Sequence, residues 1–280
     1  MMNRSLRTVC SLICAASAAA TTGCALTLDD NSITAETLVR YEGTDEIVHV
    51  EYLPTQSVRI VSDNGDVEVS TGSVSDVVVT FSPFTMRKKD EDKLAVKEIE
   101  DHLGLTAITD RASGDVVIST TQQAGASGYL GADIHVILPA DFDGGLRVEQ
   151  DNGGVEVNLD GAPSRGTTIV SDNGRIEVVG ARGAIDVTTD NGSVSVDLDA
   201  WSGSDGIIST GNGDIDLTVP AGVDGTMTAH AVNGVVVEQS LPSTWATAGD
   251  GGAKSYTMGD GDGGQLDLFT DLGDITIVPK

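Results

Sequence analysis

Residues 62–69 read Ser-Asp-Asn-Gly-Asp-Val-Glu-Val, and variants of this stretch return six more times before the chain ends. From Asn152 to Asn233 the repeats are spaced by 21, 18, 21 and 21 residues. A fixed period of about 20 residues indicates a repeat architecture, in which each unit is one small piece of structure. The seven units centre on Asn64, Asn152, Asn173, Asn191, Asn212, Asn233 and Leu272, each followed by a glycine.

Apolar and polar residues alternate in the same way in every unit. The residues four places before, three places after and five places after the Asn are apolar everywhere except at Glu238. The residues between these columns, such as Glu68 and Glu156, are mostly polar. This alternation is typical of strands with one face on a core and the other in water. The predicted core columns are Ile60, Val148, Ile169, Val187, Ile208, Ala229 and Leu268, then Val67, Val155, Ile176, Val194, Ile215, Val236 and Ile275, then Val69, Val157, Val178, Val196, Leu217 and Ile277.

Two all-β folds fit a unit of strand, Asn-Gly bend and strand. In an antiparallel hairpin meander, Asn-Gly is a two-residue turn between paired strands. In a β-solenoid, Asn-Gly is a corner, and equivalent residues of successive units stack about 4.8 Å apart. Either fold explains Asn and Gly by the positive φ that a tight bend requires. Because identity persists column by column, turn residues included, we predict the β-solenoid and keep the meander as the alternative.

A charged segment interrupts the β pattern. Residues 88–104 place charged and apolar residues at helical spacing, which predicts one amphipathic helix inserted into the array. We expect residues 46–280 to form one β-domain that contains this helix. Residues 24–45, which include the polar run Asp29-Asp30-Asn31, are predicted to be a tether that leads to it.

The first 23 residues have the features of a secretory signal peptide. Arg4 and Arg7 give a basic start, and an apolar stretch follows over residues 9–20. The segment resembles a bacterial lipoprotein signal, which implies that Cys24 carries a lipid and becomes the mature N-terminus. The alternative is cleavage after Ala20, which leaves Cys24 as a free thiol. Because Cys10 and Cys14 lie within the signal, Cys24 is the only cysteine of the mature chain. A single cysteine has no disulfide partner within the chain, and an exposed thiol is reactive, which favours a lipid-modified Cys24.

The chain is strongly acidic. It carries 43 Asp and Glu against 16 Lys and Arg, for a formal net charge of −27. A surface of this sign repels phosphates, so we expect no nucleic-acid partner. The charge has two interpretations, a solvated surface that keeps a long β-protein soluble or a surface that binds cations.

The chain resembles a known domain family. The run 134–139, Ile-His-Val-Ile-Leu-Pro, the run 146–148, Leu-Arg-Val, and the Asn-Gly-x-Val-x-Val units that follow are similar to the bacterial putative-adhesin domain family. The resemblance covers about residues 45–280, with a charged helix of the kind expected at 88–104. It implies an exported β-solenoid protein with a role in adhesion, and it implies no ligand and no catalytic residue.

A column of acids precedes the corner Asn. If the units stack, Asp151, Asp172 and Asp190 lie on one edge at the spacing of the strands, and Ca²⁺ would relieve their mutual repulsion. The alternative is that each Asp caps its own bend. A second acidic stretch, Asp260–Asp267, lacks the ligand spacing of calcium loops and is predicted to be a surface loop.

Signals of catalysis are sparse. The sequence has no Gly-x-Ser-x-Gly elbow, no pair of metal-binding Cys and no His-rich motif, so we expect no catalytic site and no cofactor other than the Ca²⁺ considered above. Four aromatic residues in loops are candidates to stack on sugars or to cover the core. They are Tyr129, Trp201, Trp245 and Tyr256.

The sequence therefore predicts an exported protein, lipid-anchored at the outer membrane or cell surface, that serves as a structural or adhesin-like binding module of the cell envelope. Its partners would be the membrane, through the N-terminal lipid, and a surface glycan or protein. An envelope protein that binds Ca²⁺ or polysaccharide is the alternative. A glycan-active β-helix enzyme is a third hypothesis, disfavoured because few basic residues are present to stabilise an anionic intermediate.

Overall fold

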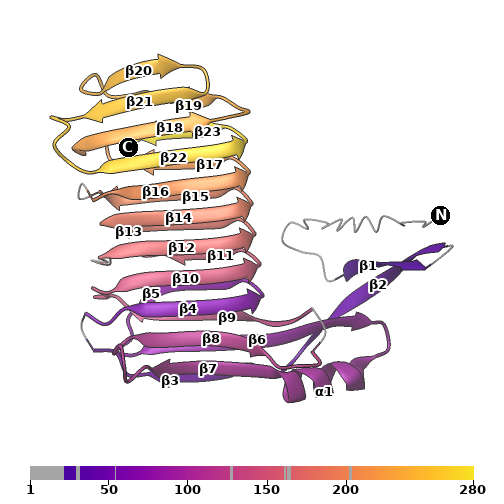
Figure 1. Cartoon of the computed structure of the whole chain (residues 1–280). Helices are drawn as coiled ribbons and strands as arrows, with labels where there is room; N and C mark the ends of the chain where they lie inside the picture. Colours follow the sequence, from indigo (N-terminus) through magenta and orange to yellow (C-terminus); the bar gives the residue numbers. More distant parts are fainter. Residues whose placement is uncertain are drawn as a thin grey trace, which may run out of the picture.

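The computed structural model describes residues 22–29, 32–53, 55–126, 129–160, 162, 165–201 and 204–280. Among these residues, strands form two large sheets that face each other across one core, and a single helix lies at one end (Figure 1). The predicted all-β class is confirmed. The inserted helix is confirmed too, because α1 (Asp92–His102) lies within the range 88–104.

The sheet that receives the strand before each corner, here the entry sheet, has 11 strands among the described residues. Its parallel part runs from β18 to β8, and antiparallel pairs close both ends. In spatial order its strands are β20 (Ala246–Asp250), β21 (Ala253–Met258), β18 (Gly225–Ala231), β22 (Gln265–Leu272), β16 (Gly206–Asn212), β14 (Ala184–Asn191), β12 (Gly166–Asn173), β10 (Gly145–Asn152), β4 (Val58–Asn64), β8 (Val116–Gln122) and β7 (Leu103–Thr109).

The sheet that receives the strand after each corner, here the exit sheet, has 12 strands among the described residues. It is parallel from β9 to β19 and antiparallel elsewhere. In spatial order its strands are β1 (Thr22–Asp29), β2 (Ser32–Glu42), β6 (Val77–Lys88), β9 (Leu130–Pro139), β5 (Val67–Gly72), β11 (Val155–Asn158), β13 (Ile176–Arg182), β15 (Val194–Ala200), β17 (Ile215–Val219), β23 (Ile275–Pro279) and β19 (Val236–Glu238), with β3 (Glu46–Val50) also paired to β6.

Each Asn-Gly unit forms one rung, with one strand in each sheet. The strand β10 runs parallel to both β4 and β12, and Asn152 is in register with Asn64 and Asn173. A hairpin meander would instead pair β10 with β11 in antiparallel fashion, so that alternative is wrong. The physical reason lies in the columns: side-by-side rungs in register place each apolar residue against its counterpart, which buries every column at once.

The core fills the space between the two sheets. Every apolar residue of the three predicted columns is buried, which confirms that prediction. The single polar member, Glu238, accepts a hydrogen bond from the Tyr256 hydroxyl at 2.9 Å. Beside Glu238, at the end of the stack formed by β18 and β19, Trp245 and Tyr256 pack edge to face with ring centroids 6.4 Å apart and cover the last rung.

The spatial order of the rungs differs from their order along the chain. The last unit, β22 and β23, lies between the β16–β17 rung and the β18–β19 rung. At the other end, β4 and β5 lie between β8–β9 and β10–β11. Since every unit offers the same apolar columns, several orders would bury the core equally well, and the sequence pattern does not distinguish them.

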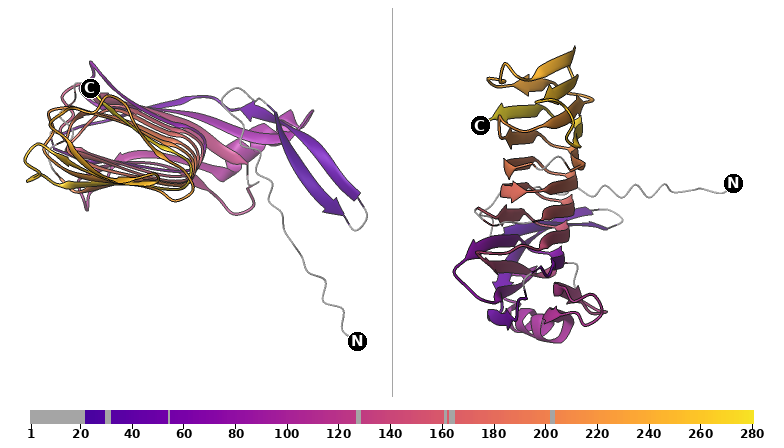
Figure 2. Two further views of the ribbon diagram at one scale, coloured as in Figure 1. Left: turned by 90° about the horizontal axis from the view of Figure 1, so that it is seen from above. Right: turned by 90° about the vertical axis from the view of Figure 1, so that its left-hand side faces the viewer.

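One part of the molecule projects sideways from the stack, and we call it the flange. It consists of β1, β2, residues 82–88 of β6 and residues 130–133 of β9, where these two strands continue past the corners. Seen from above, the rungs outline a flattened tube and the flange extends from one side of it (Figure 2). The range 24–45, expected to be a tether, thus contains strands. Residues 1–21 of the predicted signal peptide lie outside the described residues.

Candidate functional site

The corner asparagines form a ladder of side-chain hydrogen bonds along one edge of the stack. Asn152 Nδ2 donates to Asn64 Oδ1 at 3.2 Å, and Asn173 Nδ2 donates to Asn152 Oδ1 at the same distance. Asn191 and Asn212 extend the ladder with bonds of 3.1 and 2.8 Å. At its first end, Asn64 donates to the backbone carbonyl of Leu130 in the flange, at 3.1 Å. The ladder therefore ties consecutive corners to one another and to the flange.

The corner glycines are required by close stacking as well as by φ. Gly153, Gly174 and Gly192 have φ of +141°, +148° and +154°. A Cβ on Gly174 would lie 1.8 Å from the carbonyl oxygen of Gly153, and one on Gly192 would lie 1.9 Å from that of Gly174. The corner Asn does not share this conformation, so the prediction that Asn supplies positive φ is wrong. The described non-glycine residues with positive φ are Thr55, Asp90 and Ser240.

The structure places four acids of the predicted column at equivalent positions of neighbouring strands. Asp63, Asp151, Asp172 and Asp190 precede asparagines that are in register on β4, β10, β12 and β14. Partial desolvation of the Asp151 carboxyl raises its pKa, and the Asp172 and Asp63 carboxylates raise this pKa further. Within the described residues, no group of three or more His, Cys, Asp or Glu side chains could hold a metal ion. Calcium binding by Asp151, Asp172 and Asp190 stays a prediction.

The acids two places after the corner Asn make backbone contacts instead. Asp66 Oδ1 accepts a hydrogen bond from the backbone N–H of Gly154 on the next rung, at 2.7 Å. Asp214 accepts the equivalent bond from the N–H of Asp274, at 2.8 Å. Asp274 in turn accepts one from Val235 at 2.9 Å. These carboxylates link rungs to one another, a role that the sequence pattern had not assigned to them.

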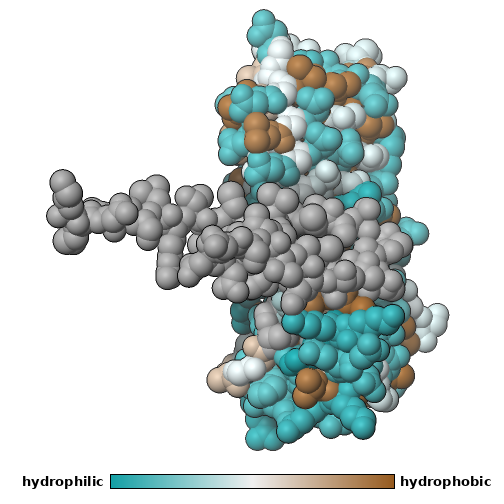
Figure 3. Space-filling view, turned by 90° about the vertical axis from the view of Figure 1, so that its right-hand side faces the viewer, coloured by the Kyte–Doolittle hydropathy of each residue, from teal (hydrophilic) through white to brown (hydrophobic). Residues whose placement is uncertain are grey.

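The corner edge becomes less acidic and more apolar toward the C-terminal rungs. Asp271 is separated from the other acids, because β22 lies between β16 and β18, whose matching residues are Gly211 and Val232. Val232, Val235 and Leu272 are about half exposed. Figure 3 faces this edge and shows hydrophobic residues gathered near the C-terminal end, with a mostly hydrophilic surface at the opposite end.

The second acidic stretch, Asp260–Asp267, includes the start of β22 and the turn before it. The backbone N–H of Gly261 donates to Asp224 Oδ1 at 2.8 Å. Asp262 lines a groove of about 590 Å³ together with Asp224 and Trp201. The stretch is thus held against the neighbouring turn by a hydrogen bond to the Asp224 side chain.

The four histidines lie on separate elements. His49 is on β3, His102 ends α1, His135 is on β9 and His230 is on β18. His135 Nε2 lies 3.7 Å from a carboxylate oxygen of Glu68, and the His230 ring packs against Phe269 on the outer face of the entry sheet. The absence of catalysis stays a prediction, and no role in catalysis is assigned to these side chains.

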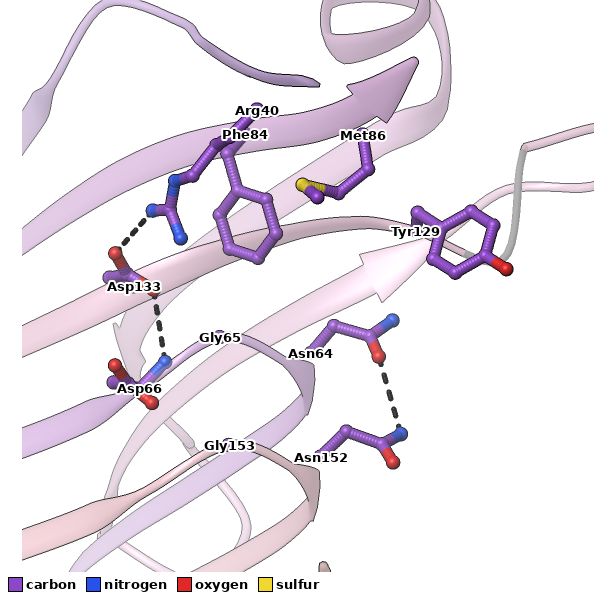
Figure 4. Close-up of a pocket in the computed structure, with 10 residues that line it drawn as sticks. All are labelled: Arg40, Asn64, Gly65, Asp66, Phe84, Met86, Tyr129, Asp133, Asn152 and Gly153. Carbon is purple, nitrogen blue, oxygen red and sulfur yellow. Dashed lines mark hydrogen bonds and ion pairs between the residues drawn. The ribbon is translucent and has the colours of Figure 1, made fainter. Parts of the chain in front are cut away.

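A pocket of about 280 Å³ lies where the flange leaves the stacked corners (Figure 4). It forms because β6 and β9 continue straight where the neighbouring rungs turn at their Asn-Gly corners. We call it the flange pocket. Its walls come from β2, β6, the start of β9 and two successive corners, and its lining residues are Arg40, Asn64, Gly65, Asp66, Phe84, Met86, Tyr129, Asp133, Asn152 and Gly153.

The charged groups of the flange pocket are held in place by one another. Arg40 pairs with the Asp133 carboxylate, and its Nε lies 3.7 Å from a Glu42 carboxylate oxygen. The Arg40 Cζ also lies 3.8 Å from the centroid of the Phe84 ring, a distance typical of a cation–π contact. Asp133 accepts a second hydrogen bond, of 3.0 Å, from the backbone N–H of Asp66. The pocket therefore presents one guanidinium and two carboxylates in fixed positions.

Of the four aromatic residues offered by the sequence as sugar-stacking candidates, three are buried. Trp201, Trp245 and Tyr256 are 6%, 7% and 1% exposed. This burial fits residues that cover the core. Tyr129 is 49% exposed and lines the flange pocket. Sequence reasoning missed the other residues of the flange pocket, because Arg40 and Asp133 are separated by 93 residues and no short motif joins them.

Among the described residues, no helix is both long and apolar enough to cross a membrane. No protein-family model matches the chain, and no curated protein matches it.

Several solved structures are similar to this chain. One is a putative cell adhesion protein from Clostridium sporogenes, 11% identical, with 85% of this chain and 99% of that chain covered and a TM-score of 0.42. Another is a putative adhesin from Parabacteroides distasonis, 8% identical, covering 84% and 98% with a TM-score of 0.37. A third is a putative adhesin from Bacteroides fragilis, 7% identical, covering 84% and 97% with a TM-score of 0.28.

Proposed function

We propose that the chain is a surface-exposed, lipid-anchored module of the cell envelope, in which a β-solenoid serves as the rigid body of a structural or adhesin-like binding protein. The observation that carries the proposal is the in-register stacking of corners from Asn64 to Asn212. A body of this kind can hold a binding site at a fixed distance from its anchor.

The β-solenoid interpretation rests on three features of the rungs. Successive strands alternate between the two sheets, neighbouring rungs are parallel, and corner residues lie beside corner residues. The Asn ladder and the close Gly contacts add side-chain and backbone links between rungs. Links repeated at every rung oppose bending of the stack, which suits a spacer.

The anchor is assigned to Cys24, which lies on β1 in the flange. Removal of residues 1–23 would take two residues from β1 and leave Cys24 opposite Thr37 on β2. A lipid on Cys24 would attach the molecule through its flange and leave the outer faces of the rungs in water. The net charge of −27 disfavours anionic lipid headgroups and nucleic acid as further partners.

The binding role is assigned to the surface of the stack and flange, with a glycan or a protein of the cell surface as the partner. We assign no catalytic role and no cofactor. An envelope protein that binds Ca²⁺ along its acidic column is the second candidate, supported by the in-register strands that place Asp151 between Asp63 and Asp172.

The anchor and the surface location can be tested together. The full-length chain is expressed in a bacterium that has an outer membrane, in the presence of radiolabelled palmitate, and intact cells are then probed with an antibody. Label should appear in the parent and in Cys14→Ala, a matched change within the predicted signal, and should vanish in Cys24→Ala. Intact cells of the parent should bind the antibody. A parent that takes up no label, or that binds antibody only after the cells are lysed, would refute the proposal.

A further inference from the structure

We propose that the flange pocket binds one uncharged sugar unit, with Tyr129 as its stacking platform. This inference rests on the proposed function, because it names the ligand class of the adhesin-like module. It concerns a site between the flange and the corners at Asn64 and Asn152, which lies beside Asp151 of the predicted calcium column but is not lined by it.

The size of the pocket sets the size of the ligand. Its volume of about 280 Å³ lies just below the roughly 300–1,000 Å³ typical of small-molecule sites. Such a pocket takes one ring-sized group and leaves the rest of a longer chain outside. A terminal sugar or one unit of a glycan fits this description, and an extended polysaccharide buried along its length does not.

The pocket has an apolar side suited to a sugar ring. The Phe84 ring, which is 7% exposed, and the Met86 side chain lie on neighbouring positions of one strand face, and Tyr129 stands to one side of them (Figure 4). An aromatic face carries partial negative charge, and the C–H groups on one face of a pyranose carry partial positive charge, so the two stack. An exposed tyrosine keeps this platform accessible.

The charged side chains of the pocket offer hydrogen-bond donors and acceptors. A guanidinium has five N–H donors, more than the Arg40 contacts to Asp133 and Glu42 can use. A carboxylate accepts through two oxygens, and Asp66 commits only one of them, Oδ1, to the N–H of Gly154. Hydroxyl groups both donate and accept, so a sugar can satisfy the two kinds of group together. Because ion pairs hold Arg40 and a backbone hydrogen bond holds Asp66, little ordering of these groups is needed on binding.

The charge of the pocket selects against anionic ligands. Arg40 is balanced by Asp133, and Asp66 adds a further negative charge, on a chain whose net charge is −27. A carboxylated or sulfated sugar would meet this excess negative charge at short range. A neutral hexose or N-acetylhexosamine meets no such penalty, and this distinguishes the proposed ligand from uronic acids.

The test uses saturation-transfer NMR on the purified full-length protein. The probes are the methyl glycosides of glucose, galactose, mannose and N-acetylglucosamine, with methyl glucuronide as the anionic comparison. At least one neutral glycoside should receive saturation, and the glucuronide should not. Absence of transfer to all four neutral glycosides at millimolar concentration, or equal transfer to the glucuronide, would overturn the proposal.

Two pairs of variants locate the site. Tyr129→Ala should weaken binding about tenfold, whereas Phe269→Ala, which removes an exposed aromatic residue from the outer face of the entry sheet, should not. Asp66→Asn should also weaken binding while retaining the acceptor for Gly154, and Asp214→Asn is its matched control, because Asp214 makes the same contact on a distant rung. Circular dichroism establishes that all four variants fold.

Equal binding by Tyr129→Ala and the parent would overturn the assignment to this pocket. Failure of the sugar assay is distinguishable from failure of the proposed function, because palmitate labelling and antibody access on intact cells do not depend on the pocket.

Discussion

Replacing one corner glycine by alanine distinguishes two explanations of the Asn-Gly repeat, stacked corners and hairpin turns. Gly174 has φ of +148°, so an alanine there has a backbone cost of about 1–3 kcal/mol. Its Cβ would also lie 1.8 Å from the carbonyl oxygen of Gly153, and moving a packed neighbour costs about 1–3 kcal/mol more. Gly174→Ala should therefore lower the free energy of unfolding by about 2–6 kcal/mol.

Two other glycines supply matched controls. Gly251 has φ of +57°, and a Cβ on it would have no atom within 4 Å, so Gly251→Ala measures the backbone cost alone, about 1–2 kcal/mol. A Cβ on Gly222 would have no neighbour within 4 Å either, and Gly222 has no positive φ, so Gly222→Ala should change stability by less than about 0.5 kcal/mol. The loss of stability should rank Gly174 first, Gly251 second and Gly222 last.

The assay is thermal unfolding of the purified full-length variants, followed by far-UV circular dichroism. For a domain of this size each kcal/mol corresponds to about 2–4 °C, so Gly174→Ala should lower Tm by about 4–24 °C. A hairpin turn would require the positive φ but no contact with the next unit. A loss for Gly174→Ala equal to that for Gly251→Ala would therefore refute stacked corners.

The remaining predictions concern charged side chains. Folding raises the pKa of Asp151, so ionisation weakens the fold as pH rises from the ordinary to the raised pKa. Asp151→Asn should consequently raise Tm at pH 7, and salt should reduce this gain. The gain should disappear when the pH is below the pKa of Asp151 in both the unfolded and the folded chain. A Tm lower than that of the parent at pH 7 would contradict this prediction. Calcium should raise the Tm of the parent and not of the Asp172→Asn, Asp190→Asn double variant, and a parent Tm indifferent to calcium would remove the calcium hypothesis. Glu98 is buried and accepts hydrogen bonds from Thr85 and Arg87, so Glu98→Ala should cost about 3 kcal/mol in urea unfolding, whereas the exposed Glu100→Ala should cost little. Equal losses for the two would show that the buried contacts contribute nothing.

The cross-section of the molecule could be predicted from the sequence. Columns such as Ile169, Ile176 and Val178 repeat in every unit, and stacking the units in register buries all of them. The chemistry of the corner was predicted less well. Gly174 was expected to provide positive φ, and it does, but its contact with Gly153 depends on the next rung. The Asn ladder likewise exists only between rungs, so a single unit carries no sign of it.

The order of the rungs and the flange pocket could not be predicted. Units with identical columns can replace one another without loss of buried area, so nothing local places Leu272 beside Asn212. The pocket depends on pairs of strands far apart in sequence, which bring Arg40 to Asp133. Tyr129 alone was identifiable beforehand, as an aromatic residue in a polar loop, and its exposure separates it from the buried Trp201.

Spin labels on two pairs of outward-facing residues test the stacking of rungs most directly. Glu156 and Glu177 are in register on the neighbouring parallel strands β11 and β13, at a backbone spacing of about 4.8 Å. A hairpin at Asn173-Gly174 would instead place Val170 opposite Glu177, whereas here Val170 lies in the entry sheet and Glu177 in the exit sheet. The measurement is dipolar broadening in the electron paramagnetic resonance spectra of Glu156→Cys, Glu177→Cys and of Val170→Cys, Glu177→Cys, with the native cysteines replaced by serine. Stacked rungs predict strong broadening for the first pair and none for the second. Broadening for the second pair and none for the first would contradict the account.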